Sequence, residues 1–214
     1  MSGPLRTGVH PIEVESYAIL RARIDTTDLP PLTRAVVERV VHTSADPSWA
    51  GDLVCDEDAL RAGRAALLAG APLVTDVRMV AAGITARPTT VALDLPGVRE
   101  LATAEGLTRS AAGVRTAVRA HPVGGIWVIG NAPTALVELL RCAAAGLLSS
   151  PLVIGLPVGF VGSVAAKAAL RAAGLPALSN RSERGGAAAA AAAVNALLYC
   201  VEPDDADPGS REPG

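Results

Sequence analysis

The fold class is indicated most clearly by residues 126–155, IWVIGNAPTALVELLRCAAAGLLSSPLVIG. This stretch begins with a short β-type run at Ile126–Gly130, continues as a helical pattern at Pro133–Ala145, and ends in a second β-type run at Leu152–Gly155. A proline suits the first turn of a helix, where no backbone donor is needed. A strand, a helix and a further strand in this order predict a βαβ unit with two parallel strands.

The same alternation continues on both sides of this unit. Further β-type runs occur at Leu73–Asp76, Thr90–Asp94 and Ala177–Asn180, and further helical patterns at Thr108–Ala120, Val164–Ala173 and Gly186–Tyr199. Strands that alternate with helices predict an α/β fold, here a flavodoxin-like three-layer α/β/α arrangement with a mainly parallel five-stranded sheet. Such sheets bind ligands beyond the carboxyl ends of their strands.

The N-terminal third predicts extra helices that precede the sheet. They are expected at Glu13–Ile24, within residues 28–43 and within residues 55–70, the last of them capped by Asp56. The final segment VEPDDADPGSREPG, residues 201–214, carries acids, Pro and Gly and little to bury, so we interpret it as a disordered tail. Residues 1–200 are therefore expected to form a single domain.

Composition argues against several classes of partner. The chain has a net charge of −2 and no basic block, which argues against a phosphate-backbone binder. Two Trp, two Tyr and one Phe are too few for base stacking, so we expect no nucleic-acid partner. No apolar run reaches about 18 residues, so no membrane span is expected. Three scattered cysteines predict reduced thiols in a cytoplasmic protein.

Three glycine-containing turns lead from predicted strands into predicted helices: VIGNAPTALVELL, VIGLPVGFVGSVAAK and LSNRSERGGAAAA. Exposed amides at helix starts favour anions, whereas glycine at any single turn can simply permit a tight bend. Three such turns at one sheet edge favour a shared anionic ligand. None matches a dinucleotide or nucleoside triphosphate motif, so neither of those cofactors is supported.

The histidines predict no metal site, since His10, His42 and His121 lie far apart in sequence. His42 follows Arg39 by three residues, so the two share a helix face. A histidine at a helix end is more often structural than functional. Here, however, an apolar face continues up to His42, and the ring is expected where that face meets a cavity. From the residues alone both interpretations stay open.

Several motifs in order resemble one known family. IEVESYAILR, RVVHTSAD, AALLAGAPLVTDVRMVAAGIT, GLTRSAAG, VIGNAPTAL and GLPVGFVGS together resemble precorrin-8X methylmutases, over roughly residues 12–200. The resemblance implies a flavodoxin-like fold, a homodimer and no cofactor. It also implies an isomerisation in cobalamin biosynthesis, in which a methyl group moves from ring carbon 11 to ring carbon 12 of precorrin-8X to give hydrogenobyrinic acid. A cobalt-containing substrate would give cobyrinic acid.

The resemblance also assigns residues. It implies that His42 is catalytic and that Ser16, Arg39, Thr85 and Arg109 bind substrate. A histidine suits this reaction because an ordinary imidazole gives and retakes a proton near neutral pH. No metal ligand is implied.

Two departures from the family pattern keep alternatives open. Ala165 stands where many members have glutamate, and Ala187 stands where many have serine. A non-catalytic corrinoid carrier on the same fold is one alternative. A generic nucleotide-binding α/β enzyme is the other, although the sequence offers no phosphate loop for it.

Overall fold

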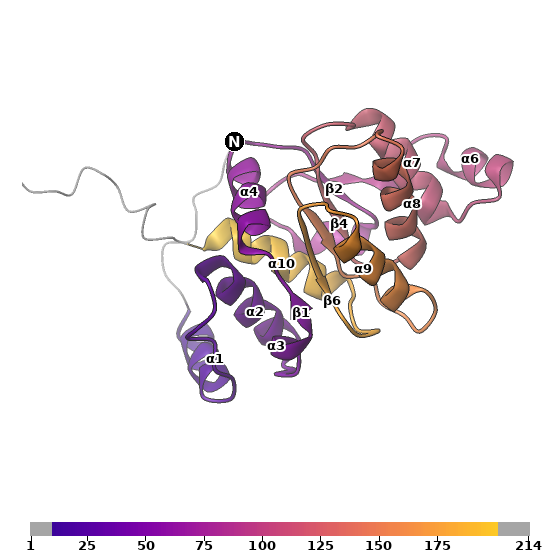
Figure 1. Ribbon diagram of the computed structural model, residues 1–214. Helices are drawn as coiled ribbons and strands as arrows, with labels where there is room; N and C mark the ends of the chain where they lie inside the picture. Colours follow the sequence, from indigo (N-terminus) through magenta and orange to yellow (C-terminus); the bar gives the residue numbers. More distant parts are fainter. Residues whose placement is uncertain (1–9, 201–214) are drawn as a thin grey trace, which may run out of the picture.

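A six-stranded sheet forms the centre of the computed structural model, which describes residues 10–200 (Figure 1). The predicted acidic tail lies outside the described residues. In spatial order the strands are β1 (Leu53–Val54), β6 (Ala177–Asn180), β5 (Val153–Gly155), β4 (Ile126–Ile129), β2 (Leu73–Thr75) and β3 (Thr90–Val91). From β2 to β6 all pairings are parallel, and the order of these five strands is that of flavodoxin-like sheets.

The predicted α/β fold is confirmed, but the predicted number of strands is one too few. The five predicted strands form at or within their expected ranges. The sixth, β1, pairs antiparallel with β6 at the sheet edge, with Leu53 opposite Asn180. Its two residues are too short a run to show the period-two pattern that identifies a strand in a sequence.

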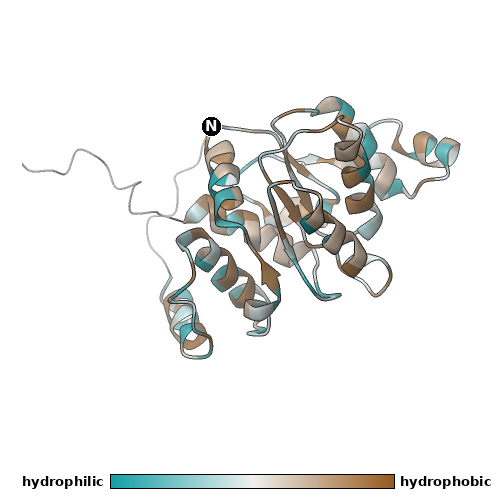
Figure 2. Cartoon of the chain, in the orientation of Figure 1, coloured by the Kyte–Doolittle hydropathy of each residue, from teal (hydrophilic) through white to brown (hydrophobic). Residues whose placement is uncertain are grey.

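Helices cover both faces of the sheet. One face carries α1 (Pro11–Arg21), α2 (Pro31–Ser44), α4 (Glu57–Leu68), α5 (Arg78–Gly83) and α10 (Ala187–Tyr199), and the other carries α7 (Arg109–Ala120), α8 (Pro133–Ala144) and α9 (Ser163–Ala172). Strand residues alternate between the two cores, so Val128 faces α10 and Trp127 faces α8. The short helices α3 (Trp49–Asp52), α6 (Val98–Glu105) and η1 (Ala92–Asp94) complete the described chain. Figure 2 shows hydrophobic strands between helices that present one polar side.

The alanine-rich helix α10 is a real helix that lies against α2, α4 and α5. Its small side chains allow very close approach. A Cβ atom added at Gly83 would lie 2.6 Å from the Cβ of Ala191, and one added at Gly130 would lie 2.8 Å from that of Ala190. The alanine run therefore brings the N-terminal helices close to the sheet.

Candidate functional site

A buried carboxylate fastens α1 to α2. Glu38 of α2 accepts hydrogen bonds from Arg21 at 2.7 Å, from Thr26 at 2.7 Å and from Arg34 at 2.9 Å. Burial alone would raise the pKa of Glu38, but these three donors lower it to about 2. The helix pair is thus held by a charged group that stays ionised over the physiological range.

His42 lies in the last turn of α2, where α1 supplies two contacts to its ring. Its Nδ1 atom is 2.9 Å from Oγ of Ser16, and the ring of Tyr17 stacks on it with centroids 4.9 Å apart and planes 5° from parallel. The imidazole is half-buried. One ring nitrogen is therefore occupied, and Nε2 is the nitrogen left for a ligand.

The predicted cavity beside His42 is present as an open hollow of about 270 Å³ between α1 and α2. Its walls are partly apolar and partly charged, formed by Ile12, Glu15, Ser16, Ile19, Leu20, Arg23, Val41, His42, Ala45 and Pro47. Such a mixture of an apolar surface and a few polar groups is typical of ligand sites.

Arg39 lies one turn before His42 but faces a different hollow. Its Nη1 donates to Oε1 of Glu13 at 3.0 Å, and its guanidinium carbon is 6.0 Å from the ring centroid of Tyr199. Arg39, Tyr17 and Tyr199 line a hollow of about 190 Å³ that is separate from the one at His42. The expected contact of Arg39 with substrate stays a prediction.

Arg23 is the cation in the wall of the His42 hollow, and the sequence analysis missed it. It is exposed, and among the described residues its side chain has no ion-pair partner. Its spacing could have identified it, because Ser16, Ile19 and Arg23 follow the i, i+3, i+7 pattern of one helix face. In the structure α1 ends at Arg21, so Arg23 lies just beyond the helix that was predicted to include it.

Thr85 and Arg109 do not lie with Ser16 and His42. Thr85 is exposed after the end of α5, and Arg109 begins α7. Arg109 lines a hollow of about 470 Å³, which shares no lining residue with the hollow at His42. Figure 1 shows α1 and α2 at one end of the molecule and α7 toward the other.

The larger hollow adjoins the switch point of the sheet, between β2 and β4, where doubly wound folds commonly bind ligands. Here a side chain of the protein fills that position. Asp76, buried after β2, accepts hydrogen bonds from the amides of Gly130 at 3.1 Å, Asn131 at 2.8 Å and Ala132 at 3.1 Å. Burial raises the pKa of Asp76, and the amide donors oppose that rise.

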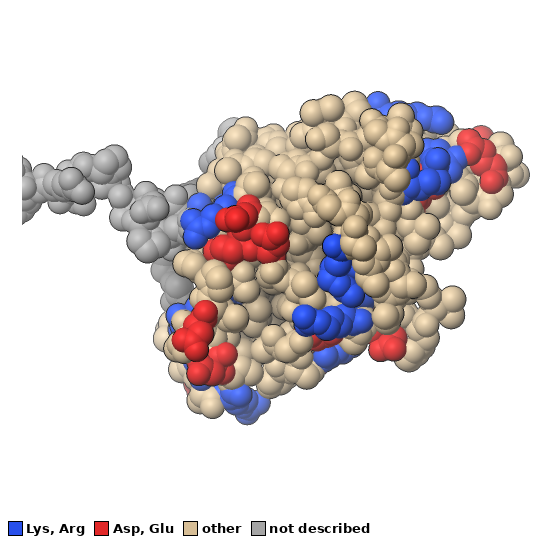
Figure 3. Space-filling view, viewed as in Figure 1, with Lys and Arg blue, Asp and Glu red and all other residues tan. Residues whose placement is uncertain are grey.

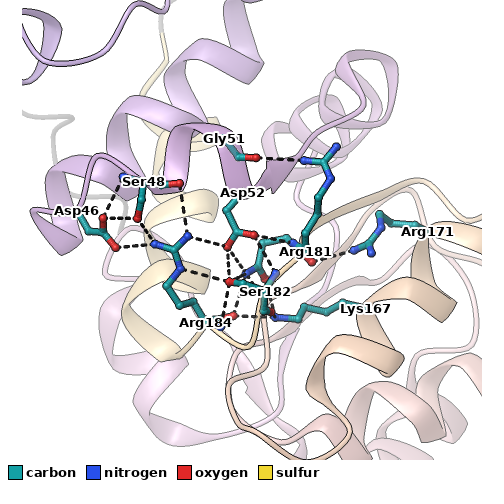
Figure 4. Close-up of polar contacts among 10 residues, drawn as sticks. Asp46, Ser48, Gly51, Asp52, Lys167, Arg171, Arg181, Ser182 and Arg184 are labelled. Atoms are coloured by element: carbon teal, nitrogen blue, oxygen red, sulfur yellow. Dashed lines mark hydrogen bonds and ion pairs between the residues drawn. The ribbon is translucent and has the colours of Figure 1, made fainter.

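The turn between β6 and α10 is filled in the same way (Figure 4). Asp52, from α3, accepts hydrogen bonds from the amides of Arg181 at 3.0 Å and Ser182 at 2.8 Å and from Nδ2 of Asn180 at 2.8 Å. Two of the three turns that were expected to bind an anion therefore bind carboxylates of the chain itself. The expectation of one ligand shared by all three turns is wrong for that reason.

The single lysine of the chain also serves this turn. Lys167 of α9 is fully buried and donates to Oδ1 of Asn180 at 2.8 Å and to the backbone carbonyls of Ser182 and Arg184. Burial lowers its pKa to about 8. Because all three ammonium protons have acceptors inside the protein, Lys167 is a structural cation rather than a ligand-binding one.

Within residues 10–200 no cluster of three or more His, Cys, Asp or Glu side chains could hold a metal ion. None of the helices in that range is both long and apolar enough to cross a membrane. On the face shown in Figure 3, Lys and Arg form small separate groups rather than one continuous field.

Comparison with known proteins gives a consistent result. The family model described as precorrin-8X methylmutase matches residues 11–200. The chain is similar to a cobalt-precorrin-8 methylmutase of Methanothermobacter thermautotrophicus, with 39% identity over 86% of this chain and 89% of that protein. It is similar to a precorrin-8X methylmutase of Pseudomonas aeruginosa, with 42% identity over 86% and 91%.

A solved structure agrees with these two relatives. The precorrin-8X methylmutase of Thermus thermophilus superposes with a TM-score of 0.79 at 33% identity, covering 87% of this chain and 93% of that one. The likeness therefore extends over the sheet and the extra N-terminal helices together.

Proposed function

The chain belongs to the precorrin-8X methylmutase family, a family of isomerases, and from this we propose that it moves a methyl group from ring carbon 11 to ring carbon 12 of a precorrin-8X-type tetrapyrrole in cobalamin biosynthesis. The metal-free substrate, which gives hydrogenobyrinic acid, is our first choice. The cobalt-containing substrate, which gives cobyrinic acid, is the alternative, because the relatives include proteins of both names. The observation that supports the proposal best is the position of His42 in the wall of an open hollow, held at Nδ1 with Nε2 left over.

His42 would act as the proton donor. A 1,5-shift of a methyl group needs no external nucleophile, only electron demand at the receiving carbon, and protonation of a ring nitrogen supplies that demand. Donation from Nε2 leaves the proton on Nδ1 in place, so Oγ of Ser16 can accept the same hydrogen bond before and after the transfer. Positioned proton transfer contributes about 10² to 10⁴-fold, and the remainder comes from holding the macrocycle in a reactive shape.

Arg23 would bind a carboxylate at the rim of the tetrapyrrole. Ile12, Ile19 and Leu20 give the ring an apolar surface, and Arg23 is the cation beside them. Arg39, the residue that the family resemblance suggests, is paired with Glu13 and lines the neighbouring hollow. We therefore assign the first carboxylate contact to Arg23 and keep a contact of Arg39 for a substrate that displaces Glu13.

A second copy of the chain would complete the site. A hollow of about 270 Å³ lies below the usual range of about 300–1,000 Å³ for ligand sites, so a tetrapyrrole would project beyond it. Thr85 and Arg109 lie outside this hollow, and we infer that they reach the substrate from the partner of a homodimer. Co-expressed His42→Ala and Arg109→Ala chains would then form mixed dimers with one intact site, and activity would return. Two separately inactive chains that never complement each other would contradict this arrangement.

An absorbance assay with metal-free and cobalt-loaded substrates tests the function. Wild-type protein should convert one of them, and His42→Ala should bind the corrinoid without isomerising it. Full turnover by His42→Ala would remove His42 from the mechanism. A spectral change limited to binding by the wild type would instead identify a corrinoid carrier. Activity should survive a chelator, since we propose no metal or organic cofactor.

The same proposal places the protein in the cytoplasm. Cys55 and Cys142 are thiols, and burial raises the pKa of Cys55 to about 12. Free thiols of this kind, one buried and one partly buried, fit a reducing compartment, as the scattered cysteines predicted. Labelling with a thiol reagent before and after denaturation would test this, because the buried Cys142 should react only in the unfolded protein.

A further inference from the structure

The ring of His42 is restrained from two directions by consecutive residues of α1. Oγ of Ser16 lies 2.9 Å from Nδ1 of the imidazole. Tyr17 lies on the face of the same ring, at a centroid distance of 4.9 Å and an angle of 5°. A hydrogen bond at one nitrogen fixes that atom but leaves the ring free to tilt about it. The parallel aromatic ring removes the tilt.

We propose that Tyr17 is a positioning residue for the isomerisation, which sets the plane of the His42 imidazole and so keeps Nε2 directed at the substrate. The proposal rests on the function assigned to His42 above. The stack can persist in both protonation states of His42, because an aromatic face attracts an imidazolium cation and also packs against a neutral imidazole. Tyr17 can therefore hold His42 before and after the proton leaves.

Tyr17 is itself fixed by charged neighbours. The guanidinium carbon of Arg21 lies 5.5 Å from the centre of its ring, and Arg21 is bound to the buried Glu38. Burial raises the pKa of the Tyr17 phenol, and the nearby Arg39 opposes that rise. The ion pair of Arg39 with Glu13 keeps Arg39 beside the phenol. This gives Arg39 a place in the site that does not require it to touch the substrate.

Replacing the aromatic ring while keeping the rest of the site tests the proposal. Tyr17→Leu should lower kcat about 10- to 100-fold, because a displacement of about 1 Å at a reacting group can cost about 10²-fold. KM should change by less than about twofold, since Tyr17 is absent from the lining of the substrate hollow. Tyr17→Phe keeps the stack and should retain most of kcat.

Tyr199→Leu is the matched control, because Tyr199 lines the same small hollow as Tyr17 but contacts Arg39 instead of His42. It should leave kcat and KM near their wild-type values. Tyr17→Met serves as a second non-aromatic variant if Tyr17→Leu does not fold, and thermal melts of all variants report folding. Wild-type kcat in Tyr17→Leu or Tyr17→Met would overturn the proposal. So would an equal loss in Tyr17→Phe, because the phenol hydroxyl and not the stacked ring would then be responsible.

The wild type and His42→Ala in the same assay separate this proposal from the function itself. If His42→Ala is inactive while Tyr17→Leu turns over normally, only the role of Tyr17 falls. If the wild type converts neither substrate, or His42→Ala converts one at full rate, the proposed function falls and takes the role of Tyr17 with it.

Discussion

The carboxyl edge of the sheet and the hollow between α1 and α2, here called the groove, differ in how their polar groups are paired. At the sheet edge, Asp76 and Asp52 occupy backbone amides that would otherwise face a ligand, and Lys167 fills the carbonyls of the last turn. In the groove, His42 and Arg23 line an open hollow. The usual binding edge of the fold is thus largely satisfied internally, and the groups left for a ligand belong to α2 and to the segment just after α1, both of which precede the sheet in sequence.

This contrast explains how a flavodoxin-like sheet can serve a reaction without a phosphate-bearing cofactor. The carboxylate of Asp76 already accepts hydrogen bonds from three backbone amides, so an external anion cannot bind the same amides. The sheet edge then supports the fold, and side chains from the α1–α2 region are the ones left to act on a ligand. Substitutions at Asp76, Glu38, Arg23 and Ser16 test this difference between the two regions.

Removing the internal carboxylate at the switch point should have the largest effect, and on stability. Asp76→Ala leaves the amides of Gly130, Asn131 and Ala132 without their acceptor. Unpaired buried donors cost about 1–3 kcal/mol each, so we expect a loss of about 4 kcal/mol in the free energy of unfolding, measured with urea. Asp94→Ala, which removes an exposed carboxylate paired with Arg78, should cost less than about 1 kcal/mol.

Inorganic phosphate sharpens the same experiment. It should partly restore the stability of Asp76→Ala, because the vacated amides resemble the anion sites of related sheets. Phosphate should not change the unfolding of the wild type. A variant as stable as the wild type would show that Asp76 does not support the edge.

The groove should respond to acid through Glu38, the carboxylate that joins α1 to α2. Its folded pKa of about 2 lies below its ordinary value of 4.5, so its stabilisation is present above pH 4.5 and is lost as the pH falls from 4.5 toward 2. Glu38→Gln should lower the free energy of unfolding by about 2 kcal/mol at pH 7, since it removes charged hydrogen bonds. The difference from the wild type should shrink as the pH approaches 2.

Glu138 provides the matched control at the other end of the molecule. It is buried between Arg115 and Arg141, and its pKa is likewise about 2. Glu138→Gln should show a similar acid dependence but should spare the kinetics of the His42 site. If Glu38→Gln retained the full acid dependence of the wild type, Glu38 would not be the group that titrates.

Sequence patterns predicted most of the fold because most of it is periodic. Five strands and seven long helices follow from alternation of apolar residues, and Asp56 caps α4 as expected. The short elements β1, α3, α5 and α6 were not predicted, because two to eight residues are too few to show a clear hydrophobic periodicity. The role of Asp76 escaped for a different reason: its amide partners are more than 50 residues away in sequence.

The candidate site was predictable in part. The spacing of Arg39 and His42 predicted that they share a helix face. Only the packing of α1 shows that Arg39 pairs with Glu13 and that His42 contacts Ser16. Which of two neighbouring cavities a side chain enters depends on tertiary contacts, and no helical spacing states it. Arg23 lay inside the predicted helix Glu13–Ile24, but helical spacing alone does not show that it lines the same hollow as His42.

Arg23→Ala tests whether the open cation of the groove binds substrate. Loss of one charge-assisted contact should raise KM about tenfold with little change in kcat, and higher salt should reduce the difference. Arg119→Ala is the control, because Arg119 is an exposed arginine that lines a different hollow, beside α7. Equal KM values for the two variants would show that the carboxylate is bound elsewhere.

Ser16→Ala should give the smallest of the four effects and the most specific one. Without Oγ the proton of His42 is no longer held on Nδ1, so part of the population carries it on Nε2 in the wrong neutral tautomer for accepting the returning proton. We expect kcat to fall about fivefold, in line with the loss of about 1 kcal/mol for one hydrogen bond. Ser16→Thr should keep the hydroxyl and most of the rate. Ser44→Ala removes a hydroxyl from the same turn of α2 that bonds only to backbone groups, the carbonyl of Val40 and the amide of Asp46 among them, and it should leave kcat unchanged. If Ser16→Ala raised KM and kept kcat, Ser16 would be a substrate contact, as the family resemblance implies, and Tyr17 alone would orient the imidazole.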